Sequence, residues 1–181
     1  VLSRRRGDVA ANLSTSRMVD DVAARFGGRV VRTPVGEANV ARAIREYGCV
    51  IGGEGNGGVI DPRICLVRDS LSAMSLVLQL LASTGRPLSA LVAELPRYVI
   101  VKRKFECAAG RVAPAVEAVT RAFADQQPNR SDGVRVDLPE GWVHVRGSNT
   151  EPIIRVIAEA ADEATAEALI SRAIQAAGLP G

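Results

Sequence analysis

The chain has 181 residues, of which 47% are hydrophobic and 24% charged. This is the composition of a globular protein and excludes an intrinsically disordered one. A net charge of +3 and an aromatic content of 3% argue against a nucleic-acid binder, and no apolar run approaches the ~18 residues of a membrane span.

The first half of the sequence alternates short apolar runs, typical of strands, with segments whose apolar residues repeat at helical spacing. In chain order these are 8–12, 18–26, 29–32, 40–47 and 49–51. Asp69 is then a predicted N-cap of a long helix, and Pro87 fits the first turn of a short one. The apolar residues expected on the inner face of the long helix are Leu71, Met74, Leu78 and Leu81. This alternation predicts a parallel sheet covered by helices, with ligands bound beyond the carboxyl ends of the strands.

The order of elements changes near residue 96. A predicted strand at 98–106 is followed by a helix at 113–124, opened by Pro114, and then by three strands in succession at 134–138, 142–146 and 153–158. Asp162 is the predicted N-cap of a last helix, whose inward residues are Leu169, Ile170, Ala173 and Ile174. The sequence therefore predicts two domains. Residues 1–95 form an α/β three-layer domain with a mostly parallel sheet, and residues 96–181 a smaller α+β domain with an antiparallel sheet.

A segment between two predicted strands, residues 146–152, gathers groups that suit a phosphate dianion. Arg146 offers a charged fork, Ser148 and Thr150 offer hydroxyls, and Asn149 offers an amide. Gly147 allows the tight turn that brings backbone N–H groups to the same place. The alternative interpretation is an ordinary polar turn, because these residue types are common in turns.

Arg155 follows this segment and has two open interpretations. It can pair with Glu151, or it can reach the same anion as Arg146. The sequence leaves both open.

A second candidate is the glycine-rich segment 53–58, with the letters GEGNGG. It lacks the G-x-G-x-x-G and Gly-Lys-Ser/Thr patterns of nucleotide sites. Glu54 and Asn56 instead suit sugar hydroxyls, because the carboxylate accepts and the amide both donates and accepts. The turn containing Gly36 and Glu37 is expected at the same edge of the sheet. A flexible turn with incidental polar residues is the alternative.

The sequence offers no catalytic set and no metal site. His144 is the only histidine and has no cysteine or histidine at ligand spacing, so a structural role is favoured. Cys49, Cys65 and Cys107 contain no C-x-x-C pair, which indicates a reducing, cytoplasmic environment. The chain thus carries two binding loops without an evident catalyst.

Three phrases of the sequence resemble the α-D-phosphohexomutase superfamily, which includes phosphoglucosamine mutases and phosphomannomutase/phosphoglucomutases. They are residues 33–40 (TPVGEANV), 53–58 (GEGNGG) and 146–155 (RGSNTEPIIR). The resemblance spans nearly the whole chain and implies the third and fourth domains of a four-domain enzyme, its C-terminal half.

The resemblance also implies roles. The implied sugar-binding residues are Glu54, Asn56, Gly36 and Glu37. The implied phosphate-binding residues are Arg146, Gly147, Ser148, Asn149 and Thr150, with Arg155 in support. The family's phosphorylated serine and magnesium-binding aspartate loop have no match in this sequence. The chain is therefore expected to contain no catalytic residue, to bind no magnesium, and to be inactive without the N-terminal domains.

The implied function is that of the substrate-binding half of a phosphohexomutase, which interconverts hexose 6-phosphate and hexose 1-phosphate through a bisphosphate intermediate. Phosphoglucosamine mutase is the favoured member, and phosphomannomutase/phosphoglucomutase is the alternative. A stand-alone phosphosugar-binding regulatory module is an alternative of another class. An RNA-binding protein is a third, disfavoured by the low charge and few aromatics. The expected partners are a hexose phosphate and the N-terminal domains of the same protein, with no nucleic acid and no membrane.

Overall fold

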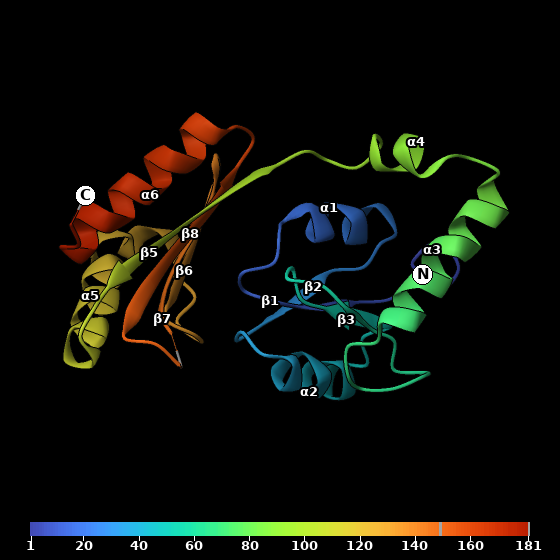
Figure 1. Cartoon of the computed structure of the whole chain (residues 1–181), viewed down its shortest axis with the longest axis horizontal. Coiled ribbons are helices and arrows are strands. Elements are labelled where there is room, and N and C mark those ends of the chain that lie inside the picture. Colours follow the sequence, from blue (N-terminus) through green and yellow to red (C-terminus); the bar gives the residue numbers. More distant parts are fainter. Residues whose placement is uncertain (149, 181) are drawn as a thin grey trace. The chain divides into compact units, whose positions relative to one another are not determined.

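The computed structural model describes residues 1–148 and 150–180, and for Ala109 the backbone only. The chain forms two compact units, Val1–Arg97 and Tyr98–Gly181, each built on its own sheet (Figure 1). Across the described parts of the chain, no helix has the length and apolar character needed to cross a membrane.

The first unit contains a four-stranded sheet in the order β2-β1-β3-β4. The strands are β1 (Val9–Asn12), β2 (Val30–Thr33), β3 (Ile51–Gly53) and β4 (Val59–Ile60). Strand β1 pairs in parallel with both β2 and β3, whereas β4 is antiparallel to β3. The carboxyl ends of three strands therefore meet at one edge of this sheet.

Helices α1 (Met18–Arg25) and α2 (Glu37–Tyr47) cover opposite faces of this sheet (Figure 1). Successive side chains of a strand point to opposite faces. Val9 accordingly shares a buried cluster with Ala23 of α1, while Ala10 packs with Val40 of α2. The predicted three-layer arrangement with a mostly parallel sheet is confirmed.

Strand β3 begins at Ile51, two residues after the start of the strand predicted at 49–51. The reason is the end of α2. Gly48 takes the left-handed conformation that ends the helix, and Cys49 N still donates to Ile44 O at 3.1 Å. The N–H of Cys49 therefore belongs to the end of the helix and not to the strand ladder.

Two further helices complete this unit, α3 (Ser70–Thr84) and α4 (Leu88–Val92). Asp69 caps α3 as predicted, because its carboxylate accepts hydrogen bonds from the backbone N–H groups of Leu71 and Ser72 at 3.0 and 3.1 Å. Pro87 stands at the N-cap of α4, one position before the predicted first turn.

The predicted inner face of α3 is wrong. Leu71, Met74 and Leu78 are 70%, 53% and 65% exposed, and the buried residue of the helix is Ser72. Apolar residues occur on more than one side of α3, so their spacing cannot single out one inward face. The helix is anchored at its start, where Asp69 N donates to Val59 O at 2.9 Å.

The second unit contains an antiparallel sheet in the order β5-β8-β7-β6. Its strands are β5 (Val99–Glu106), β6 (Val134–Leu138), β7 (Gly141–Gly147) and β8 (Ile153–Ala160). Leu138 pairs with Gly141, so β6 and β7 form a hairpin with a two-residue turn. This sheet confirms the predicted α+β class.

The helical elements of the second unit are α5 (Ala109–Ala122), the 3-10 turn η1 (Ala124–Gln126) and α6 (Glu163–Ala177). Helix α5 begins four residues before the predicted start, so Pro114 lies inside it rather than opening it. A proline inside a helix removes one backbone donor and crowds the carbonyl four residues earlier. The first turn of α5 forms nevertheless, with Arg111 N donating to Ala108 O at 2.8 Å. Asp162 caps α6, as predicted, through Thr165 N at 2.8 Å.

Candidate functional site

The residues predicted to bind a sugar lie at the carboxyl edge of the parallel strands in the first unit. Glu54 directly follows β3, while Gly36 is the N-cap of α2 and Glu37 is its first residue. Asn12 is the last residue of β1, the strand between β2 and β3. Three stretches that are distant in sequence therefore deliver polar groups to one place.

Glu54 is buried, with 8% of its surface exposed. Its Oε1 accepts hydrogen bonds from Asn12 Nδ2 at 2.6 Å and Gly36 N at 2.9 Å. Its Oε2 lies 3.5 Å from Nη1 of Arg68. A carboxylate oxygen has about two lone-pair sites, so Oε1 is filled and Oε2 is the atom with room for a ligand hydroxyl.

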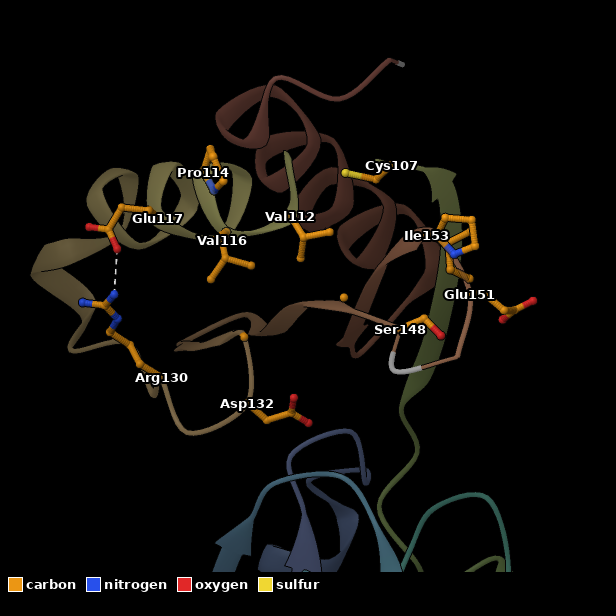
Figure 2. A pocket seen from close by; sticks show the side chains of 14 residues that line it. Cys107, Val112, Pro114, Val116, Glu117, Arg130, Asp132, Ser148, Glu151 and Ile153 are labelled. Atoms are coloured by element: carbon orange, nitrogen blue, oxygen red, sulfur yellow. Dashed lines mark hydrogen bonds and ion pairs between the residues drawn. The ribbon is translucent and has the colours of Figure 1, made fainter. Parts of the chain in front are cut away.

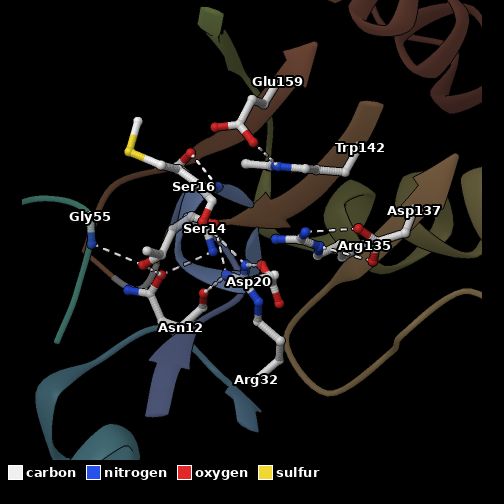
Figure 3. Close-up of polar contacts among 12 residues, drawn as sticks. Asn12, Ser14, Ser16, Asp20, Arg32, Gly55, Arg135, Asp137, Trp142 and Glu159 are labelled. Atoms are coloured by element: carbon white, nitrogen blue, oxygen red, sulfur yellow. Dashed lines mark hydrogen bonds and ion pairs between the residues drawn. The ribbon is translucent and has the colours of Figure 1, made fainter. Parts of the chain in front are cut away.

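Asn12 is not among the predicted site residues, and it holds Glu54 in place. Its Oδ1 accepts from Ser14 N at 3.0 Å and from the Thr15 hydroxyl at 2.9 Å. The Thr15 hydroxyl in turn accepts from Gly55 N at 2.9 Å (Figure 3). The signal for Asn12 was its position at the end of a strand whose neighbours both supply predicted site residues.

Gly36 donates its backbone N–H to Glu54 from a conformation that favours glycine. Its φ is 126°, a region that side-chain-bearing residues rarely adopt. The backbone is thereby turned toward the carboxylate at the start of α2.

Arg68 joins the remaining predicted sugar-binding residues and was also not selected from the sequence. Glu37 Oε2 accepts from Arg68 N at 3.1 Å and from Arg68 Nε at 2.8 Å. These bonds hold the pKa of Glu37 below its usual value. Asn56 Oδ1 accepts from Arg68 Nη1 at 3.2 Å. The structure thus brings Gly36, Glu37, Glu54 and Asn56 together.

The predicted phosphate loop, residues 146–152, comprises the last two residues of β7 and the connection to β8. Gly147 is the last residue of β7, and Ser148 N donates to Ile153 O at 2.9 Å, which closes the loop at its base. The hydroxyl oxygens of Ser148 and Thr150 are 3.4 Å apart. Asn149 lies outside the described residues.

Two arginines stand opposite each other at the base of this loop. Arg146 of β7 and Arg155 of β8 are direct register partners. Arg146 Nε donates to Asp132 Oδ2 at 3.0 Å, and Arg155 Nη2 donates to Glu151 Oε2 at 2.9 Å. Like charges directly opposite each other are destabilising, so each needs a compensating anion. Of the two interpretations of Arg155, the structure shows the ion pair with Glu151.

A cavity of about 910 Å³ lies within the second unit beside this loop (Figure 2). Ser148 and Gly147 line it on the loop side, and Val112 and Val116 of α5 line it on another. Arg146 is connected to the cavity through Asp132, which also lines it.

The single histidine lies in β7 and is fully buried. Its Nε2 is 2.7 Å from Asp132 O, and burial lowers the pKa of His144 to about 4. The ring is therefore neutral near pH 7.

A second buried side chain of β7 lies two residues earlier. Trp142 donates its Nε1–H to Glu159 at 2.7 Å, and the Arg135 guanidinium group stacks on the Trp142 ring at 4.3 Å (Figure 3).

No three His, Cys, Asp or Glu side chains gather as a metal site within residues 1–148 and 150–180. The location of the magnesium ligands in another part of the protein stays a prediction.

Comparison with known proteins gives two family matches and several relatives. Residues 2–98 match the family described as phosphoglucomutase/phosphomannomutase, alpha/beta/alpha domain III, and residues 98–176 match its C-terminal domain. A protein of Methanopyrus kandleri named probable phosphoglucosamine mutase is 45% identical over 166 residues, covering 90% of this chain. A phosphoglucomutase/phosphomannomutase of Thermococcus kodakarensis is 37% identical over 172 residues, covering 93% of this chain.

The solved structure of a phosphoglucomutase/phosphomannomutase family protein from Burkholderia thailandensis matches with a TM-score of 0.80 and 27% identity. The match covers 99% of this chain and 40% of that one. The chain likewise spans only 36% and 37% of the two curated relatives.

Proposed function

Because the chain belongs to the phosphoglucomutase/phosphomannomutase family, we propose that it is the substrate-binding half of a phosphohexomutase. The whole enzyme would interconvert hexose 6-phosphate and hexose 1-phosphate. Residues 1–95 would act as the third domain and hold the sugar, and residues 96–181 as the fourth domain and hold a phosphate. The observation that carries the proposal is the cluster around Glu54 at the carboxyl ends of β1, β2 and β3.

The sugar is bound through groups already fixed before it arrives. Glu54 Oε2 accepts a hydrogen bond from a ring hydroxyl, while Asn12 and Gly36 keep the carboxylate in one orientation. A hydrogen bond to a charged group contributes about 1.5–3 kcal/mol. Because hydroxyls of the ring are present in both hexose phosphates, the same contacts serve both directions of the reaction.

The phosphate that is not reacting is bound at residues 146–150. Arg146 provides charge, Ser148 and Thr150 provide hydroxyl donors, and Arg155 lies across the strand pair. A phosphate dianion would compensate the two facing guanidinium groups, which form ion pairs with Asp132 and Glu151.

The reacting groups are proposed to lie outside this chain. A phosphoserine there transfers its phosphoryl group to the free sugar hydroxyl and gives a hexose bisphosphate. The bisphosphate turns over, and its other phosphate returns to the serine. Magnesium, bound in that other part, would neutralise charge on the phosphoryl group. The chain itself contributes positioning, on which phosphoryl transfer largely depends.

Glucosamine phosphate is the favoured substrate, supported by the name of the Methanopyrus relative. The Thermococcus relative supports mannose or glucose phosphate as the alternative. A stand-alone phosphosugar-binding regulatory module stays a further alternative, and a cytoplasmic location stays a prediction.

Steady-state kinetics of the whole protein test the proposal with glucosamine, glucose and mannose 6-phosphates. We expect turnover of at least one, with the largest kcat/KM for glucosamine 6-phosphate. The 181-residue chain alone should bind the same compound in calorimetry without turning it over. Turnover by the isolated chain would contradict the division of roles, and binding without any turnover by the whole protein would favour the regulatory module.

A further inference from the structure

Three predicted sugar-binding side chains converge on one guanidinium group. Arg68 Nε is 2.8 Å from Glu37 Oε2, and its Nη1 is 3.2 Å from Asn56 Oδ1 and 3.5 Å from Glu54 Oε2. We propose that Arg68 is a positioning residue of the sugar site, which holds these three side chains in the arrangement that receives the ring. The inference rests on the proposed function and adds to it a residue outside the motifs of the resemblance.

The backbone of Arg68 is held on both sides, so its side chain starts from a fixed point. Arg68 N donates to Glu37 Oε2 at 3.1 Å. The next residue, Asp69, caps α3 and donates its own N–H to Val59 O at 2.9 Å. A site residue supported in this way needs little reordering when a ligand binds.

Gly58 provides the space through which the Arg68 side chain passes. Its φ is +85°, and a Cβ added there would lie 2.7, 2.9 and 3.0 Å from the Cβ, Cδ and Cγ of Arg68. The aliphatic part of Arg68 is therefore packed against the backbone of the sugar loop. A side chain at position 58 would displace it.

Arg68 also decides which end of Asn56 faces a ligand. A guanidinium group only donates hydrogen bonds, so it selects the carbonyl oxygen of the amide. The NH₂ end of Asn56 is left to donate to a hydroxyl, beside the accepting Oε2 of Glu54. One donor and one acceptor are thereby set next to each other, and the cation between Glu37 and Glu54 offsets the repulsion of the two carboxylates.

The test compares Arg68→Met, Arg68→Lys and Arg29→Met in the whole protein, with glucosamine 6-phosphate as the varied substrate. Arg29→Met is a matched control, because Arg29 donates its N and Nε to Asp8 at 3.0 Å each, away from the sugar loop. We expect Arg68→Met to raise KM about tenfold and to change kcat less than about threefold, since the lost contacts serve binding. Arg68→Lys should recover part of the loss, and Arg29→Met should leave KM unchanged.

Amide hydrogen exchange of the ligand-free 181-residue chain provides a readout that does not depend on turnover. Exchange at residues 55–58 should be about tenfold faster in Arg68→Met, equivalent to about 1.4 kcal/mol, and unchanged in Arg29→Met. If the wild type is active and Arg68→Met has the same KM as the wild type, the role of Arg68 is overturned. The proposed function is unaffected by that result. A wild type that neither binds nor turns over any hexose phosphate overturns the proposed function and this inference with it.

Discussion

The two candidate loops hold their polar groups in different ways. In the sugar cluster, Glu54 is buried and its Oε1 already accepts two hydrogen bonds of 2.6 and 2.9 Å. In the phosphate loop, the hydroxyls of Ser148 and Thr150 are 3.4 Å apart, and Arg146 and Arg155 are each paired with a carboxylate. The carboxylate of the sugar cluster is aligned by hydrogen bonds, whereas the guanidinium groups of the phosphate loop are held in ion pairs with carboxylates.

This difference follows from the ligands proposed for each loop. A neutral hydroxyl gains little unless donor and acceptor are already aligned, because water competes for the same groups. A dianion attracts cations over a longer range and can displace a weaker carboxylate partner. The two loops therefore predict different responses to mutation.

The largest effect is expected from Arg146→Met in the whole protein. Loss of a desolvated charged contact should reduce transition-state stabilisation by about 2–4 kcal/mol. The ratio of kcat/KM between wild type and variant, from steady-state kinetics, measures this free energy. Arg146→Lys should recover a substantial part, because charge matters most in this loop. Arg172→Met, which removes the ion pair with Glu140 on the surface of the same unit, is the control. A loss below tenfold for Arg146→Met would contradict the assigned role.

A comparable effect, on stability rather than activity, is expected at His144. Its pKa is about 4 in the folded protein and about 6.5 in the unfolded one. The unfolded chain therefore binds the extra proton first as the pH falls. Stability contributed by the neutral ring is complete above about pH 6.5 and is lost toward pH 4, by about 3 kcal/mol. Urea unfolding of wild type and His144→Gln across this range measures the difference, and parallel pH profiles would contradict it.

Glu54→Gln should reduce the transition-state stabilisation measured by kcat/KM by about 1.5–3 kcal/mol. The reason is that charge-assisted hydrogen bonds become hydrogen bonds between neutral groups. Glu54→Asp keeps the charge but moves it, and we expect it to be no better than Glu54→Gln. That order is the reverse of the one expected at position 146, where the charge-conserving variant recovers activity. If Glu54→Asp is nearly wild type, alignment is not what distinguishes the two loops.

The smallest effect is expected from Asp132→Asn. Removing the carboxylate that pairs with Arg146 should tighten binding of inorganic phosphate to the 181-residue chain by about 0.5–1.5 kcal/mol. Calorimetric titration with phosphate measures this, with Glu140→Gln as a matched surface control. Weaker binding would show that Asp132 orients Arg146 rather than competing for it.

Much of the fold could be predicted from local pattern. Asp69 and Asp162 cap helices as expected, and the parallel and antiparallel sheets follow from the order of strands and helices. These features depend on neighbouring residues, which the sequence displays directly.

The errors arose where longer-range contacts decide. Asn12 and Arg68 join the sugar cluster through contacts between segments that are distant in sequence. The position of Asn12 at the end of β1 is its one signal, and no spacing marks Arg68. The prediction of the inner face of α3 is wrong because the apolar residues of this helix occur on several sides. The roles of the two loops and the boundary between residues 95 and 96 stay predictions.

The exposed apolar side chains of α3 have a practical consequence for anyone handling this chain by itself. The side chains of Leu71, Met74 and Leu78 expose apolar surface to solvent along one helix. Exposed apolar surface of this kind promotes aggregation. The purified chain should therefore bind fluorescent apolar dyes, and its light scattering should rise as its concentration is raised. Leu71→Gln or Leu78→Gln should lower that light scattering.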